Sequence, residues 1–220
     1  MSDTNRFAAP AQPIRLYHFA LSGHSHRVLL MLSLLGLPVE TVPVDLPRGE
    51  HKTPAFLALN PFGQIPVIQD GDLTLADSNA ILVYLAQRYD ASGLWLPQTP
   101  REMAEVQRWL SAAAGPLAFG PAHARGGQLF KRPIEPRAYD LAHKLLTVME
   151  ARLTEQRYLA STEQPTIADV AMYGYTAHAP EGGISLTHYA HIKRWIADVQ
   201  ALPGFVPLPA SALPDASCGH

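Results

Sequence analysis

Residues 59–81, LNPFGQIPVIQDGDLTLADSNAI, decide the fold of this chain. Two short apolar runs, 65–68 and 73–75, are joined by QDGD, and Asp-Gly between β-prone runs is a strong signal for a β-hairpin. The following residues open with Asp-Ser and carry an apolar stripe at helical spacing over 77–89. We therefore predict two antiparallel strands followed at once by a helix.

The segment before this stretch predicts a βαβ unit. Residues 14–19 and 39–45 have the composition of strands, and residues 26–36 between them read as a helix that ends at Gly36 and is stopped by Pro38. A strand-helix-strand unit of this kind forms a right-handed crossover between parallel strands. The predicted order up to residue 89 is β-α-β, a long connection, then β-β-α.

Beyond residue 90 the strand signal ends. Residues 91–100 form a linker that contains Gly and Pro, and the remaining apolar patterns predict helices at 101–115, 136–159, 166–178 and 188–201. We expect a flexible N-terminal extension over 1–13, an α/β domain over 14–92 and an all-helical domain over 100–220. The domain boundary is placed near residue 93.

The composition points to small-molecule or protein partners. With 220 residues, 47% hydrophobic and 16% charged, the chain has the make-up of an ordinary globular protein, and a net charge of −2 gives no electrostatic basis for binding nucleic acid or an anionic membrane. No apolar run reaches the ~18–20 residues that span a bilayer, and the first residues lack the apolar centre of a secretory signal. We expect a cytoplasmic protein. Its one cysteine, Cys218, lies near the end, which argues against a disulfide or a cysteine nucleophile.

Pro66 lies where a strand is expected to begin, and two interpretations are open. Proline costs a hydrogen bond within a sheet, so Pro66 could mark an edge strand. Alternatively, a cis Ile65–Pro66 bond could present the backbone of Ile65 to a peptide-like ligand as an added strand would be presented.

Asp77 and Ser78 also allow two interpretations. They lie at a helix N-terminus, where free N–H groups attract a carboxylate while the Asp77 side chain receives an ammonium group, as in the head of an amino acid. The simpler interpretation is a helix N-cap. Their fixed distance from Pro66, across one hairpin, favours the binding interpretation.

Together with LYHFALSGHSHRVLL (16–30) and the helical second half, residues 60–81 resemble the cytosolic glutathione S-transferase family, in its bacterial, serine-type, theta- or nu-like branch. The resemblance covers roughly residues 14–206. It implies a thioredoxin-like N-terminal domain followed by an all-α helical bundle, and a cytoplasmic homodimer with a role in detoxification. It also implies glutathione as co-substrate, without a metal.

The resemblance implies a glutathione site at His51, Lys52, Gln64, Ile65, Pro66, Asp77 and Ser78. In the family the proline is cis, and the residue before it, here Ile65, pairs its backbone with the cysteinyl part of glutathione. Asp77 and Ser78 match positions that hold the γ-glutamyl group. The first three positions lie near the glycyl carboxylate.

The reacting atom in such a site is the glutathione sulfur. A free thiol has a pKa of ~8.5, and lowering it by one to two takes ~1.4–2.8 kcal/mol, which one hydroxyl hydrogen bond to the thiolate (~1.5–3 kcal/mol) supplies. The alignment with serine-type relatives indicates Ser22 for this task, with Ser25 as the alternative. Many relatives use a tyrosine instead, but Tyr17 lies in mid-strand and is expected in the core.

The histidines near Ser22 raise the question of a metal site. His18, His24 and His26 invite a metal interpretation, but no carboxylate or thiol lies beside them at ligand spacing, so we expect no metal.

The second-substrate pocket is expected between the domains, with Trp109 and Phe119 as candidates, although Trp109 also fits a core position. Two further segments fit structural or mobile roles. RGGQLFKR (125–132) resembles a solvated loop, which could alternatively cover the pocket. TIAD (166–169) predicts a reciprocal helix cap.

The predicted function is therefore a glutathione transferase. It binds glutathione, stabilises the thiolate through Ser22 and conjugates it to a small hydrophobic electrophile. One alternative is glutathione-dependent reduction of peroxides or disulfides, which uses the same thiolate. Another is a binding or scaffold protein that keeps the fold with little catalysis.

Overall fold

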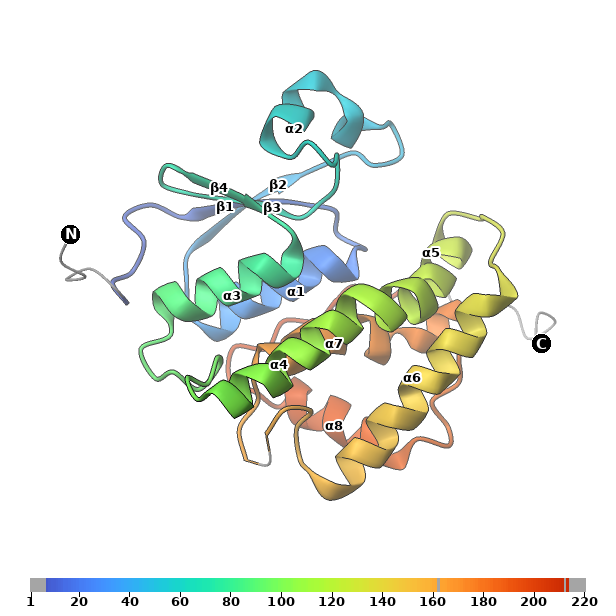
Figure 1. Cartoon of the computed structure of the whole chain (residues 1–220). Helices are drawn as coiled ribbons and strands as arrows, with labels where there is room; N and C mark the ends of the chain where they lie inside the picture. The colour runs from blue at the N-terminus through green and yellow to red at the C-terminus, as the bar shows by residue number, and fades with distance from the viewer. Residues whose placement is uncertain (1–6, 162, 212, 214–220) are drawn as a thin grey trace.

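The strands form one four-stranded sheet in the order β2-β1-β3-β4 (Figure 1). Their bounds are Ile14–His18 (β1), Val39–Pro43 (β2), Val67–Asp70 (β3) and Leu73–Ala76 (β4). β1 pairs parallel with β2 and antiparallel with β3, and β3 pairs antiparallel with β4. The parallel pair and the hairpin predicted from the sequence are both confirmed.

The structure is a computed structural model and describes residues 7–161, 163–211 and 213. The first part of the expected N-terminal extension and Cys218 lie outside these residues. Within the described chain, no helix has both the length and the apolar character needed to cross a membrane.

Helices cover both faces of the sheet and then continue as a separate bundle (Figure 1). In the first half they are α1 (Gly23–Leu34), η1 (Glu50–Lys52), α2 (Pro54–Leu59) and α3 (Ser78–Tyr89). In the second half they are α4 (Pro100–Ala112), η2 (Ala113–Ala122), α5 (His123–Leu129), α6 (Pro136–Glu155), α7 (Ile167–Ala177), η3 (Ala179–Gly182) and α8 (Ala190–Gln200). α1 and α3 lie on the face of the sheet turned toward the bundle, and α2 lies on the other side. This is the predicted fold class, a thioredoxin-like α/β domain followed by an all-helical domain.

Pro66 comes just before the strand rather than within it. The Ile65–Pro66 peptide is cis, as the resemblance implies. The β1–β3 pairing begins with Tyr17 opposite Val67, so the missing N–H of Pro66 leaves no gap in the sheet. Because β3 lies between β1 and β4, the edge-strand interpretation of Pro66 is wrong.

The segment expected as a solvated loop at 125–132 is largely helical. A continuous run from α4 widens into π-type hydrogen bonding over Ala113–Ala122, which holds two prolines, and then continues as α5 to Leu129. Gly127 is required by packing, because a Cβ at this position would lie 2.3 Å from a side-chain carbon of Ile134. The two glycines were therefore misleading as a loop signal.

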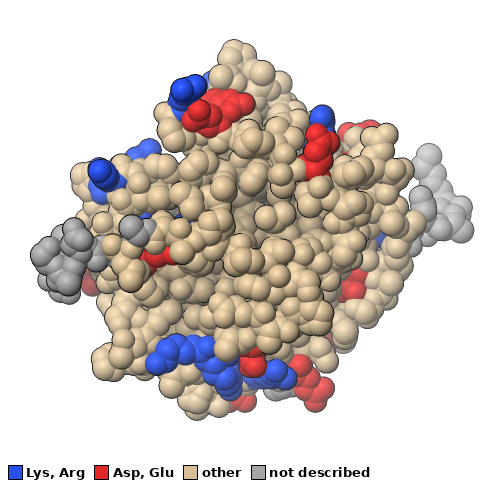
Figure 2. All heavy atoms as spheres, turned by 180° about the vertical axis from the view of Figure 1, so that it is seen from behind, with Lys and Arg blue, Asp and Glu red and all other residues tan. Residues whose placement is uncertain are grey.

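The surface seen from behind carries charges of both signs mainly toward its periphery, while other residues fill most of the middle (Figure 2). This face has no broad basic area of the kind that nucleic acid requires.

Asp169 stabilises the helical half from within. It completes the predicted reciprocal cap with Thr166 at the start of α7. Its buried carboxylate also accepts hydrogen bonds from the backbone N–H of Leu159 (2.9 Å) and from the indole N–H of Trp195 (2.9 Å). One side chain thus holds α7, α8 and the connection before α7 together.

We predict that Asp169→Ala lowers the free energy of unfolding by about 3–5 kcal/mol, because several buried donors lose their acceptor at once. The cap alone predicts a smaller loss of ~0.5–2 kcal/mol. Urea titration followed by circular dichroism measures the difference. Asp140→Ala, at an exposed position on α6, is the control and should change stability by less than about 0.5 kcal/mol. A loss below 1 kcal/mol for Asp169→Ala would contradict the role we assign to its buried contacts.

Candidate active site

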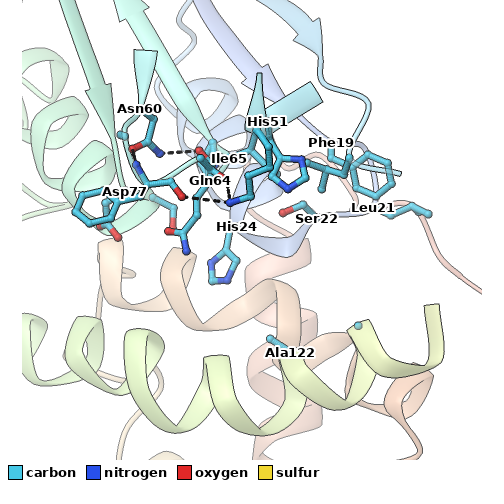
Figure 3. A pocket seen from close by; sticks show the side chains of 18 of the residues that line it. Phe19, Leu21, Ser22, His24, His51, Asn60, Gln64, Ile65, Asp77 and Ala122 are labelled. Atoms are coloured by element: carbon cyan, nitrogen blue, oxygen red, sulfur yellow. Dashed lines mark hydrogen bonds between the residues drawn. The ribbon is translucent and has the colours of Figure 1, made fainter. Parts of the chain in front are cut away.

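A cavity of about 810 Å³ lies between the α/β half and the helical half (Figure 3). The residues predicted from the sequence that line it are Ser22, His51, Lys52, Gln64, Ile65, Pro66, Asp77 and Ser78. They come from the β1–α1 junction, from η1, from the segment before β3 and from the start of α3. The sheet brings them together because β1 and β3 are neighbours.

The start of α3 is built as a polar corner. Asp77 has a positive φ of 70°, which non-glycine residues adopt rarely, and residues held in such conformations cluster at active sites. Its Oδ1 caps the helix by accepting from the N–H groups of Asn79 (3.0 Å) and Ala80 (2.9 Å). The Asp77 residue is exposed toward the cavity, and a second carboxylate oxygen is available for an ammonium group.

Arg27 supports this corner from below. Its Nη1 donates to Ser78 Oγ (2.7 Å) and to Asn79 Oδ1 (2.8 Å), while Nε and Nη2 are buried without a hydrogen-bond partner in the described chain. Burial lowers the pKa of Arg27 to about 10, opposed by Tyr175 and Asp77, so the guanidinium stays charged at neutral pH. A buried cation that lacks an ion-pair partner makes this end of the cavity attractive to an anion.

The opposite end of the cavity carries the residues expected near the glycyl carboxylate. Lys52 Nζ donates to the carbonyl of Gly63 (3.1 Å), which fixes the lysine against the loop before β3. The carbonyl of Gln64 accepts from Asn60 Nδ2 (2.7 Å), so the side chain of Gln64 is directed by an anchored backbone. His51 is close to Lys52, and burial followed by the lysine charge lowers the pKa of His51.

The structure separates the two candidate serines. Ser22 is the N-cap of α1, where its Oγ accepts from the N–H of Ser25 (3.2 Å), and it lines the cavity. Ser25 is 2% exposed, and its Oγ accepts from the N–H of Phe19 (3.3 Å) within the β1–α1 turn. The helix starts at Gly23, three residues earlier than predicted, which makes Ser22 its cap and puts Ser25 inside its first turn.

The histidines near Ser22 remain uncharged at neutral pH. Burial, aided by the charge of Arg27, lowers the pKa of His24 to about 3, and burial lowers that of His26 to about 4 although its ring contacts the carbonyl of Val206 at 2.8 Å. Burial also lowers the pKa of His18. Among the residues that the structure describes, no group of three His, Cys, Asp or Glu side chains is arranged to hold a metal ion.

The two residues expected in the second-substrate pocket lie elsewhere. Trp109 is 3% exposed in the core, because its side of α4 packs inward at helical spacing. Phe119 is 65% exposed and borders a separate groove with His123 and Arg137. The apolar wall of the cavity is instead made by Phe19 and Leu21 beside Ser22 and by Ala122, Leu129, Phe130 and Tyr175 of the helical half.

Arg125 connects the helical half to the segment that carries Ser22. Its Nη1 donates to the carbonyl of Leu21 (2.6 Å), and its Nε donates to Glu181 Oε2 (2.6 Å). Glu181 also contacts the ring of His178 and the hydroxyl of Ser211. Burial alone would raise the pKa of Glu181, but these hydrogen bonds and the charge of Arg125 lower it to about 2.

The sequence reasoning missed Arg27, Arg125 and Tyr175. A signal existed for Arg27, because it is the one charge inside the apolar run HRVLLMLSLLG. The other two residues gave no local signal, since their roles depend on contacts across more than 100 positions of sequence, such as Arg125 with Leu21.

Comparisons with known proteins agree with this architecture. The family model for the glutathione S-transferase N-terminal domain matches residues 21–88, and that for the C-terminal domain matches residues 130–203. "Glutathione S-transferase 3" of Zea mays is 37% identical, over 90% of this chain and 96% of its own length. "Glutathione S-transferase F9" of Arabidopsis thaliana is 32% identical, over 86% and 91%.

A solved structure gives the same result. The crystal structure of a glutathione S-transferase from Pseudomonas fluorescens has a TM-score of 0.84 and 38% sequence identity, and the match covers 90% of this chain and 100% of that one. A thioredoxin-like domain, a helical domain and a polar-to-apolar cavity between them define the class. The chain belongs to the glutathione S-transferase family of enzymes.

We predict that Glu181 stabilises the fold in a pH-dependent way. Its folded-state pKa is depressed from 4.5 to about 2, so this stabilisation is present above about pH 4.5 and is lost as the pH falls toward 2. At pH 7, Glu181→Gln should therefore lower the free energy of unfolding by about 3 kcal/mol. The difference from the unsubstituted protein should shrink steadily in urea titrations at pH 5, 4 and 3. Glu155→Gln, at an exposed position on α6, is the control. A difference that stays constant with pH would contradict the prediction.

Proposed function

We propose that this protein is a serine-type glutathione transferase that binds glutathione in the cavity, stabilises its thiolate through Ser22 and directs it to a hydrophobic electrophile. One observation carries the proposal: the hydroxyl of Ser22 shares a single cavity with the polar corner at Asp77 on one side and with the apolar wall on the other. A nucleophile held there has its recognition groups and an apolar acceptor pocket within reach.

Glutathione binds in the order that the cavity suggests. The γ-glutamyl ammonium and carboxylate lie at Asp77 and Ser78, above the buried cation of Arg27. The cysteinyl backbone pairs with Ile65, and the glycyl carboxylate lies toward His51, Lys52 and Gln64. This orientation is supported by the exposed carboxylate of Asp77, which can receive an ammonium group, at one end and by Lys52 at the other, and it places the cysteinyl sulfur near Ser22.

The chemistry then follows from thiolate stabilisation. The thiol loses its proton to solvent, Ser22 donates a hydrogen bond to the sulfur, and the N-terminus of α1 adds a favourable dipole. The thiolate attacks an electrophilic carbon; a C–S bond forms, and a leaving group departs with the electrons of its broken bond. The apolar lining of the cavity suits a small hydrophobic acceptor.

The proposal extends to the domain limits, the location in the cell, the oligomeric state and the co-substrate. We propose domain limits of 14–92 and 100–220, a cytoplasmic homodimer with a detoxifying role, and glutathione as co-substrate without a metal. The theta- or nu-like subclass and a bacterial origin remain predictions from the sequence.

We predict that Ser22→Ala raises the pKa of the bound thiol by one or more and lowers conjugation at pH 6.5 by roughly 10- to 100-fold, because one hydrogen bond to a charged group is worth ~1.5–3 kcal/mol. The dissociation constant of glutathione should change little. Ultraviolet titration of the protein–glutathione complex measures the thiolate, and conjugation to an activated aryl chloride measures the rate.

Ser25→Ala is the matched variant for this experiment. It should keep the thiol pKa and reduce stability by about 1–3 kcal/mol, because the N–H of Phe19 loses its acceptor. The opposite pattern would assign the thiolate to Ser25. A bound thiol that titrates as in solution in the unsubstituted protein would favour a scaffold protein, and hydroperoxide reduction that outpaces conjugation would favour a reductase.

We predict that Asp77→Asn raises the dissociation constant of glutathione about 10- to 100-fold, because the charged acceptor for the ammonium group is lost while asparagine retains the capping oxygen. Asparagine also tolerates a positive φ. Isothermal titration calorimetry with glutathione measures the effect, and Asp72→Asn in the exposed hairpin turn is the control. Equal affinities for the two variants would place the amino-acid head group elsewhere.

A further inference from the structure

Arg125 reaches from α5 to the turn that carries Ser22. Its side chain is 2% exposed and lines the cavity. The Nη1 atom donates to the carbonyl oxygen of Leu21 at 2.6 Å. Leu21 directly precedes Ser22, and both residues line the cavity (Figure 3). The helical half therefore holds the turn of Ser22 through a charged donor.

This hydrogen bond completes the fixation of the β1–α1 turn. Inside the turn, the N–H of Ser22 donates to the carbonyl of Phe19 at 2.9 Å, and the N–H of Phe19 donates to Ser25 Oγ at 3.3 Å. The carbonyl of Leu21 is directed at Arg125 instead. A carbonyl oxygen carries a partial negative charge, which disfavours a neighbouring thiolate unless a donor compensates it. Arg125 supplies that donor together with a full positive charge.

Arg125 and Glu181 form a buried ion pair with a definite orientation. Nε of Arg125 donates to Oε2 of Glu181 at 2.6 Å, and the two side chains are 2% and 6% exposed. Arg125 lines the cavity, whereas Glu181 does not. η3, which carries Glu181, packs against the backbone of α5, since a Cβ at Gly182 would lie 2.7 Å from the backbone nitrogen of Arg125. The positive end of the pair therefore borders the cavity, and the negative end lies behind it.

The charge of Arg125 is only partly compensated. Its Nη2 is buried without a hydrogen-bond partner in the described chain. The carboxylate of Glu181 is shared with the ring of His178 and the hydroxyl of Ser211. Burial opposes the ionisation of Glu181, but these contacts and Arg125 lower its pKa to about 2, so the carboxylate is charged at neutral pH. Because an arginine also keeps its proton, the pair is a permanent dipole with its positive end nearer to Ser22.

The other charged groups at the cavity belong to the α/β half. Arg27 and Asp77 lie at the start of α3, and Lys52 lies at the opposite end. The histidines of α1 are uncharged at neutral pH, because burial holds their pKa values low. Arg125 differs from these groups because it comes from the helical half and holds the turn of Ser22 itself.

We propose that Arg125 is a positioning residue for the transferase reaction. It holds the turn of Ser22 through the carbonyl of Leu21, and it directs the positive end of its ion pair toward the bound thiolate. The inference rests on the proposed function, because it requires a thiolate at Ser22. A positive charge in a site of low dielectric constant acts over several ångströms, so it needs no contact with the sulfur. The helical half thus helps to activate a ligand that the α/β half binds.

Glu181→Gln tests the orientation of the pair. The amide keeps the shape of the side chain and removes the negative end, so the charge of Arg125 then acts on the thiolate unopposed. The pKa of the bound thiol should fall by about 0.3 to 0.7, since Glu181 is the more distant of the two charges. Ultraviolet titration of the protein–glutathione complex measures this shift. A pKa that rises or stays the same would overturn the orientation that we infer.

Adding Arg125→Gln to Glu181→Gln tests the arginine without leaving a buried carboxylate unpaired. Both positions are then neutral, which avoids the cost of an isolated buried charge. Relative to Glu181→Gln alone, the thiol pKa should rise by about 0.5 to 1, and kcat/KM for the aryl chloride at pH 6.5 should fall about 3- to 10-fold. The dissociation constant of glutathione should change by less than about threefold, because its recognition groups lie elsewhere in the cavity.

Arg152 and Glu105 provide a matched control. Nε of Arg152 donates to the carbonyl of Leu159 at 3.0 Å, and its Nη2 donates to Glu105 at 3.3 Å, so it repeats the two kinds of contact that Arg125 makes. None of these control residues lines the cavity. Glu105→Gln, alone and combined with Arg152→Gln, should leave the thiol pKa unchanged. Circular dichroism and urea titration verify that all four proteins are folded.

The outcomes distinguish this inference from the proposed function. A thiol pKa that is the same in Glu181→Gln and in its combination with Arg125→Gln would overturn the inference, because the arginine would then only stabilise the fold. If Ser22→Ala still raises the thiol pKa in that case, the proposed function stays intact. No shift in Ser22→Ala would instead reject the proposed function.

Discussion

The close packing of α7 against α1 is the constraint on which the rest of the structure depends. α7 is buried along almost its whole length, and it contacts α1 and α3 of the α/β half and α4, η2, η3 and α8 of the helical half. Gly23 and Gly174 let the two helices approach, since a larger residue at position 23 would collide with the ring of Tyr175. Because the cavity lies where the two halves meet, this contact sets its shape.

Asp169 and Arg125 fix α7 in place, Asp169 at its first turn and Arg125 through η3, which follows its last turn. Asp169 fixes the start of α7 to α8 through Trp195, so the helix enters the core at a defined position. Beyond the other end, Arg125 joins η3 through Glu181 to the carbonyl of Leu21, beside Ser22. Both are buried charged groups whose hydrogen bonds offset part of the cost of their desolvation, and for Asp169 burial still raises the pKa. Such groups are sensitive to substitution, because removal of one partner leaves the other charged or polar group buried alone.

The charges around the cavity are unevenly distributed between its polar and apolar parts. Arg27 contributes a buried positive charge beneath Ser78. Its hydrogen bonds in the described chain go to neutral oxygens, and the Asp77 carboxylate acts on it through its charge, without a hydrogen bond. The histidines near Ser22 add no charge at neutral pH, because burial holds their pKa values low. The hydroxyls and the dipole of α1 are therefore the donors that the protein offers to a sulfur anion at this point. The apolar wall, to which α5 contributes Leu129, provides a surface for a second, uncharged reactant.

The sequence by itself determined the order of the elements, the β3–β4 hairpin and the polar residues of the α/β half that line the cavity. The element order, the hairpin and the N-cap at Asp77 follow from local rules, namely period-two and helical spacing and Asp-Gly at a turn. The other polar residues of the cavity were implied by the resemblance to the family. Only the tertiary structure decided that Ser22 rather than Ser25 faces the cavity, that Trp109 belongs to the core, and that residues 125–130 line the opposite wall. It also brought Tyr175 and Arg125 to the β1–α1 junction. Contacts of this kind join residues more than 100 positions apart and depend on which face of a helix packs inward, which no local pattern specifies.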